Sequence, residues 1–89
     1  MATYEIQITP TAVKQLATLP AKIRQQVDRK ILALAREPRP NQAKPLQGKT
    51  ENLFRLRVGD YRIVYQVEDI RLVILVIRIG HRREVYRNL

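Results

Sequence analysis

The fold of this chain is decided by residues 54–65, which read Phe-Arg-Leu-Arg-Val-Gly-Asp-Tyr-Arg-Ile-Val-Tyr. Apolar side chains alternate with others on both sides of Gly59-Asp60, and this pattern predicts two strands joined by a two-residue hairpin loop. Such a loop sets Arg57 opposite Arg62. Because directly opposed residues share one face of a sheet, the two faces differ in character. One face is apolar and consists of Phe54, Leu56, Val58, Tyr61, Ile63 and Tyr65. The other face, here called the arginine face, carries Arg55, Arg57 and Arg62, together with Val64 and Gln66.

Two helices are predicted between an N-terminal strand and this hairpin. Residues 4–9 alternate as a strand, and Thr9 is expected to cap a helix that starts at Pro10 and ends near Leu19. A longer helix is predicted from about residue 20 to residue 37, where prolines end it. The residues expected to face inward follow helical spacing: Val13 and Leu16 in the first helix; Ile23, Val27, Ile31 and Leu34 in the second.

The predicted fold class is α+β, in one domain over residues 1–89. A polar loop over residues 39–52 is expected to bring Lys44 and Lys49 toward the sheet edge. The element order is β-α-α-β-β-β, an antiparallel-dominated small sheet with a two-helix hairpin packed on one face. The last three strands are predicted at residues 53–58, 61–67 and 72–79, with a tail from Gly80.

Positive charge is the strongest feature of the composition. The 89 residues hold 17 Lys and Arg against 8 Asp and Glu, a net charge of +9. Residues 46–89 hold one Lys and eight Arg, and the planar guanidinium group binds phosphate through two hydrogen bonds at once. The charge favours a nucleic-acid ligand, and an acidic protein partner is the alternative.

Several classes of protein are disfavoured by residue usage. The chain has no cysteine and a single histidine, so a disulfide framework is absent and a metal site is not expected. The N-terminus does not read as a secretory signal. The longest apolar run, residues 72–77, is far shorter than the ~20 residues that span a membrane. We therefore expect a cytoplasmic protein without a membrane partner.

The arginine face is expected to serve function at some expense of stability. Like charges directly opposed on a sheet are destabilising, so Arg57 opposite Arg62 indicates a functional site. The alternatives are that both side chains diverge into water, or that one pairs with Glu51 or Glu84. The strand over residues 72–79 is apolar on both faces, so its outward residues need a cover, either the C-terminal tail or a partner protein. These residues are Val73, Leu75 and Ile77.

A family resemblance follows from three segments. They are Leu46-Gln47-Gly48, the hairpin over residues 56–67, and Val76-Ile77-Arg78-Ile79-Gly80-His81-Arg82 followed by Glu84-Val85-Tyr86. Together they resemble the RelE/ParE superfamily of bacterial toxins, on the RelE side. The resemblance implies a ribosome-dependent endoribonuclease that needs no metal or other cofactor. It also implies that the enzyme cleaves mRNA in the ribosomal A site and is neutralised by a RelB-like antitoxin.

The resemblance also implies roles for particular residues. Arg62, Arg82 and Tyr86 match catalytic positions, with Arg62 at the scissile phosphate and Tyr86 stacked on a base. Leu53 departs from the pattern, because relatives carry a lysine there and leucine does no acid–base chemistry. Residues proposed to compensate or support are His81, Arg55 and Lys49. Those proposed to bind RNA are Lys44, Lys49, Arg55, Arg57 and Arg83.

The expected reaction is attack of a 2′-hydroxyl on the adjacent phosphate, which gives a 2′,3′-cyclic phosphate and a free 5′-hydroxyl. Arginines stabilise the charge on the phosphoryl oxygens, whereas a single histidine excludes a two-histidine mechanism. For individual residues structural roles remain open: His81 as a turn residue, Arg82 paired with Glu84, and Tyr86 closing the sheet edge. Two other functions remain open for the whole chain, a ParE-like toxin that binds DNA gyrase and a basic RNA-binding module without turnover.

Overall fold

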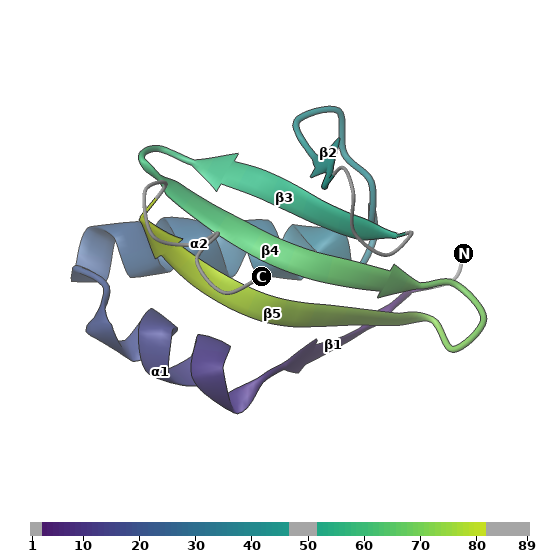
Figure 1. Ribbon diagram of the computed structural model, residues 1–89, viewed down its shortest axis with the longest axis horizontal. Helices are drawn as coiled ribbons and strands as arrows, with labels where there is room; N and C mark the ends of the chain where they lie inside the picture. The colour runs from purple at the N-terminus through teal and green to yellow at the C-terminus, as the bar shows by residue number, and fades with distance from the viewer. Residues whose placement is uncertain (1–2, 47–51, 82–89) are drawn as a thin grey trace.

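The computed structural model describes residues 3–46 and 52–81, and within them two helices lie against one face of a five-stranded sheet (Figure 1). The strand order is β1-β5-β4-β3-β2, with β1 parallel to β5 and the other neighbours antiparallel. This confirms the predicted α+β class. The elements are β1 (Glu5–Ile8), α1 (Pro10–Thr18), α2 (Ala21–Leu34), β2 (Lys44–Pro45), β3 (Leu53–Val58), β4 (Tyr61–Glu68) and β5 (Val73–His81).

The β3–β4 hairpin has the predicted register. Arg57 pairs with Arg62, and every other pair from Leu53–Gln66 to Val58–Tyr61 follows in step. Gly59 has a φ of 60° and Asp60 has no positive φ, the arrangement that places glycine first in a type II′ turn. This turn matches the twist of the strands and sets which residues share a face.

The core lies between the sheet and the two helices. In Figure 1, α2 lies behind the sheet and α1 lies beside β5 and β1. From α2, Val27, Ile31 and Leu34 are buried and Ile23 packs against them, as predicted. The residues that the sheet contributes to this cluster include Leu56, Val58, Ile63, Tyr65, Val67, Ile74, Val76 and Ile79.

The inward face of α1 differs from the prediction at one position. Val13 is 51% exposed, whereas Ala12 is fully buried and Leu16 packs against the core. Ala12 belongs to the core cluster, where its small side chain is completely enclosed. Val13 lies one residue further round the helix and therefore points outward.

Side chains of α1 complete the hydrogen bonding of β5 beyond the end of β1. Thr9 caps α1 as predicted, since its Oγ1 accepts a hydrogen bond from Ala12 N at 3.1 Å. The same hydroxyl donates to the carbonyl of Ile77 at 2.7 Å. Further along, the amide of Ile79 donates to Gln15 Oε1 at 2.8 Å. The outer edge of β5 is thus satisfied where β1 no longer covers it.

Several boundaries differ from the sequence prediction. Helix α2 ends at Leu34, three residues before the predicted residue 37, β1 covers Glu5–Ile8 rather than residues 4–9, and β4 continues one residue further, to Glu68. Lys44–Pro45 forms β2, a two-residue edge strand antiparallel to β3, within the segment predicted as loop. Two residues are too few for alternation to indicate a strand, and proline is tolerated there because an edge position needs no donor. Leu72 has a φ of 55° and belongs to the β4–β5 turn, so β5 begins one residue later than predicted. At its other end β5 continues to His81, two residues beyond Ile79.

Polar contacts hold the segment after α2 against the sheet. Arg39 donates to both carboxylate oxygens of Asp69, at 3.1 and 2.8 Å, and its guanidinium carbon lies 5.4 Å from the centre of the Phe54 ring. The hydroxyl of Tyr4 donates to Asp69 at 2.7 Å. These hydrogen bonds, first from Arg39 and then from Tyr4, lower the pKa of Asp69 to about 2. The cluster joins the residue before β1, the segment after α2 and the β4–β5 turn.

Tyr65 is fully buried beneath this segment. Its hydroxyl donates to the carbonyl of Pro38 at 2.7 Å, and its ring stacks on Phe54 with centroids 5.7 Å apart. Burial raises the pKa of Tyr65 to about 12. Tyr65 is therefore a core residue, as predicted.

Candidate nucleic-acid interface

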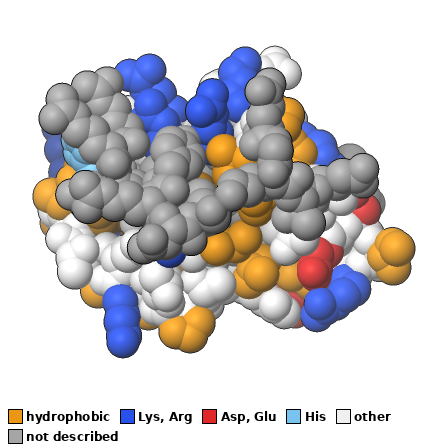
Figure 2. Space-filling view, in the orientation of Figure 1, with side chains coloured by type: hydrophobic (Ala, Val, Ile, Leu, Met, Phe, Trp, Pro, Cys, Tyr) orange, Lys and Arg blue, Asp and Glu red, His pale blue; other side chains and the backbone are white. Residues whose placement is uncertain are grey.

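Basic side chains gather on the sheet face opposite the helices. Arg55 pairs with Lys44 on one side and with Val64 on the other, and Arg57 pairs with Arg62 two residues further along β3. Figure 2 shows this face, with basic side chains along its β2–β3 margin and an apolar area beside them. Arg55 and Arg57 are exposed and Arg62 is half-buried. The structure thus brings together four residues that the sequence proposed for RNA binding or catalysis.

The two opposed arginines converge rather than diverge. Nε of Arg57 donates to the carbonyl oxygen of Gly59 at 3.0 Å, and a terminal nitrogen of Arg62 lies 3.4 Å from the same oxygen and 3.2 Å from the carbonyl oxygen of Tyr61. Within residues 3–46 and 52–81, no carboxylate forms an ion pair with either guanidinium group. Two cations therefore share one neutral acceptor. An anion with several oxygens, such as a phosphodiester, is a better ligand for this pair.

A β-bulge adds a basic residue that the sequence analysis missed. The β4–β5 register shifts between Val64 and Tyr65, so Tyr65 pairs with Val76 whereas Val64 pairs with Arg78. If side chains alternated strictly along β5, Arg78 would lie on the helix side of the sheet. The extra residue, Ile77, shifts the alternation by one position, so Arg78 lies on the arginine face. Because β5 is apolar on both faces, its sequence does not indicate where the bulge lies.

An apolar cluster lies among these cations. Leu53 is 8% exposed and Val64 is fully buried, and Leu46 and Ile77 pack against them. Leu53, at the position where the resemblance expects a lysine, is therefore a packing residue. Val73, Leu75 and Ile77 lie on the arginine face as predicted, yet Val73 is only 5% exposed. A partner protein would gain contact mainly with the half-buried Leu75 and Ile77.

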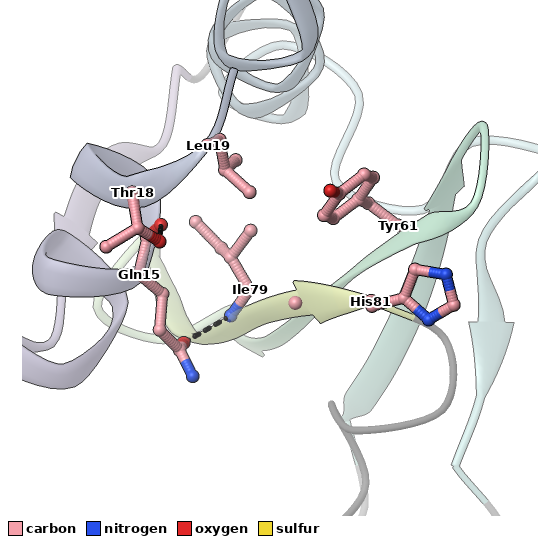
Figure 3. Close-up of a pocket in the computed structure, with 7 residues that line it drawn as sticks. Gln15, Thr18, Leu19, Tyr61, Ile79 and His81 are labelled. Carbon is pink, nitrogen blue, oxygen red and sulfur yellow. Dashed lines mark hydrogen bonds between the residues drawn. The ribbon is translucent and has the colours of Figure 1, made fainter.

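His81 lies apart from Arg62. It pairs with Tyr61, and their rings meet edge to face with centroids 5.8 Å apart, whereas Arg62 pairs with Gly80. Neighbouring residues of a strand point to opposite faces, so His81 belongs to the helix side at the end of the sheet. There it lines a pocket of about 270 Å³ (Figure 3) together with Tyr61, Ile79, Gly80, Leu19, Thr18 and Gln15.

Four predicted site residues lie outside the described residues. These are Lys49, Arg82, Arg83 and Tyr86. Their roles stay predictions, as do the suggested pairs with Glu51 and Glu84. Across residues 3–46 and 52–81, no three His, Asp or Glu side chains are grouped to hold a metal ion. No helix in the same ranges is long and apolar enough to cross a membrane.

Comparison with known proteins identifies a family that matches nearly the whole chain. Residues 6–86 match the family described as the ParE toxin of the type II toxin–antitoxin system parDE. The toxin RelG of Mycobacterium tuberculosis is 33% identical over 86 residues, covering 96% of this chain and 98% of that protein. The mRNA interferase toxin RelE of Escherichia coli is 34% identical over 86 residues, covering 93% of this chain and 90% of that protein.

A solved structure shows the same fold. The archaeal RelE–RelB complex from Pyrococcus horikoshii contains a chain that superposes with a TM-score of 0.81 at 31% identity, covering 93% of this chain and 99% of that one. The βααβ₄ order, the opposed arginines and these matches over nearly the whole length lead to one conclusion. The chain belongs to the RelE/ParE superfamily of type II toxin–antitoxin toxins, and it is RelE-like.

Proposed function

We propose that this toxin is an endoribonuclease that cleaves mRNA in the A site of the ribosome, in the cytoplasm. The observation that carries the proposal is the convergence of Arg57 and Arg62 on the carbonyl oxygen of Gly59, with Arg55 and Lys44 on the same face. This is a rigid, cationic surface of the kind that a phosphodiester needs. The mRNA interferase name of the E. coli relative supports the same reaction.

In the proposed reaction the 2′-oxygen attacks the adjacent phosphorus while the bond to the 5′-oxygen breaks. The proton of the 2′-hydroxyl leaves to a base, and the departing 5′-oxygen takes up a proton. Arg62 stabilises the charge that grows on the phosphoryl oxygens, and Arg57 supports it. Removal of one such donor typically lowers the rate by ~10²–10³.

Proton transfer is the weak part of this site. Leu53 is buried and His81 lies on the helix side, so neither is placed beside Arg62 to exchange protons with RNA. Arginine scarcely releases a proton at neutral pH. By resemblance we assign Arg82 and Tyr86 to the remaining contacts with the substrate. A site that is strong in charge stabilisation and weak in bases needs an RNA held in line by something else, and this favours dependence on the ribosome.

The proposed inhibitor is a RelB-like antitoxin encoded by the partner gene. The P. horikoshii relative was solved in complex with RelB. Here the partner is expected to cover Leu75 and Ile77 with apolar side chains and to bring acidic residues to the arginines. Co-purification with the product of the adjacent gene tests this assignment.

Primer extension on a translated mRNA tests the cleavage. Wild-type toxin should give ribosome-dependent cuts, and Arg62→Ala should reduce them by ~10²–10³. The matched control is Arg71→Ala, because Arg71 lies in the β4–β5 turn and pairs with Glu68 at 3.0 Å. The control should cleave like wild type.

Two outcomes would overturn the proposal. Inhibited DNA supercoiling with intact mRNA would identify a gyrase-binding toxin. This alternative is retained because the matched family is described as a ParE toxin. RNA binding with no cuts, whether or not the ribosome is present, would identify a binding module without turnover.

A further inference from the structure

The cations of the arginine face stand in two rows that cross the strands. The first row, nearest the β3–β4 turn, holds Arg57 and Arg62, which are directly paired. The second row lies two residues further along each strand and is formed by consecutive register pairs. Its members are Lys44 on β2, Arg55 on β3, Val64 on β4 and Arg78 on β5.

The spacing of the rows suits a nucleic-acid strand. Two residues along a β-strand advance it by about 7 Å, which is comparable with the separation of neighbouring phosphates on one RNA strand. Val64 interrupts the second row and is fully buried, with Leu53 and Ile77 beside it. Phosphates therefore fit beside the cations at the margins of this row rather than at its buried centre.

Arg78 is held in this row by the structure around it. The carbonyl of Ile77, the residue before it, accepts from Thr9 at 2.7 Å. The amide of Ile79, the residue after it, donates to Gln15 at 2.8 Å. One anchor is the N-cap residue of α1 and the other lies in the middle of that helix. The bulge that aims Arg78 is therefore fixed on both sides rather than being an irregular strand end.

We propose that the two rows bind consecutive phosphates of a single RNA strand and that Arg78 is a phosphate-binding residue of the second row. This inference depends on the proposed function, since it concerns how the same face holds its RNA. The first row holds the scissile phosphate, and the second row holds its neighbour. An RNA strand bound this way runs along β3 and β4, away from the hairpin turn.

The salt dependence of RNA binding tests the role of Arg78. The probe is a fluorescein-labelled 2′-O-methyl oligoribonucleotide, which keeps the phosphates but blocks cleavage, and binding is followed by anisotropy between 20 and 200 mM KCl. For a single strand each phosphate contact contributes about 0.7 to the slope of log K against log salt. We expect Arg78→Gln to reduce that slope by about 0.7 and Arg78→Lys to preserve it. Arg71→Gln, a change of equal charge in the β4–β5 turn, should leave it unchanged.

The outcomes separate this inference from the proposed function. An unchanged slope in Arg78→Gln, with its urea-unfolding midpoint near that of wild type, overturns the role of Arg78 and leaves cleavage untouched. Equal losses in Arg78→Gln and Arg78→Lys, accompanied by lower midpoints, also overturn it, because the residue then acts through packing. If Arg78→Gln weakens only the binding of the antitoxin, Arg78 belongs to a protein interface instead. Absence of ribosome-dependent cuts by the wild type contradicts the proposed function, whatever the slopes are.

Discussion

Removing the hydroxyl of Thr9 is the sharpest test of how this fold is assembled. The hydroxyl caps α1 by accepting from Ala12 N, and it donates to the carbonyl of Ile77 in the bulge of β5. Loss of an N-cap costs about 1 kcal/mol, and loss of a part-buried hydrogen bond costs about 1 kcal/mol more. Thr9→Ala should therefore lower the free energy of unfolding by about 2 kcal/mol. In a domain of this size that lowers Tm by roughly 8–16 °C.

Two control variants isolate the hydroxyl. Thr9→Ser keeps the donor and acceptor and should stay within about 0.5 kcal/mol of wild type. Thr18→Ala removes an exposed hydroxyl that donates to the carbonyl of Gln15 within α1, and it should also change stability by no more than about 0.5 kcal/mol. Urea unfolding followed by circular dichroism measures all three. If Thr9→Ala is no more destabilising than Thr18→Ala, then α1 is not anchored to β5 through this side chain and the reasoning fails.

Three further predictions concern the hairpin and the groups with shifted pKa values. Burial raises the pKa of Tyr65 to about 12. The neutral phenol therefore makes its full contribution to the free energy of unfolding below pH 10, and this contribution is lost at about 1.4 kcal/mol per pH unit as the pH rises from 10 to 12. Tyr65→Phe should lower the free energy of unfolding at pH 8 by about 1 kcal/mol, because the Pro38 carbonyl loses its donor. Above pH 10 the stability of this variant, measured by urea unfolding, should fall less steeply with pH than that of wild type; an equal fall in both proteins would contradict this. Arg39 lowers the pKa of Asp69 to about 2. The charged carboxylate therefore stabilises the folded protein above about pH 4, and this stabilisation is lost as the pH falls toward 2. Asp69→Asn should make acid unfolding less steep in that window, and an unaltered profile would refute the assignment. Gly59→Ala should cost about 1–2 kcal/mol because φ is 60°, although no atom lies within 4 Å of the added Cβ; Gly59→Asn should cost less, and equal thermal denaturation of both variants would show that the turn relaxes.

The hairpin and the arginine face could be predicted because a two-residue turn fixes which residues are opposed. Once Gly59-Asp60 is recognised, every pair in β3 and β4 follows, and so does the position of Arg62. The place of Arg78 could not be predicted, because β5 is apolar on both faces and its sequence therefore does not show which residues point to which side of the sheet. The packing of Ala12 in place of Val13 was missed for another reason. Hydrophobicity favours the larger side chain, whereas close approach of a helix to a strand favours the smaller.

In the proposed RNA site, the carbonyl oxygen of Gly59 holds the side chains of Arg57 and Arg62 in place before a ligand binds. Fixing a long side chain costs up to ~2 kcal/mol of conformational entropy, and for Arg57 and Arg62 that cost has been met during folding, because both are already directed at one point. A ligand that arrives must replace this neutral acceptor with something stronger. Chloride offers a single centre and has little advantage in that exchange, whereas the two unbridged oxygens of a nucleotide linkage satisfy both arginines together. If the proposed function is right, selectivity for polyanions over simple salt anions therefore depends on the hairpin turn.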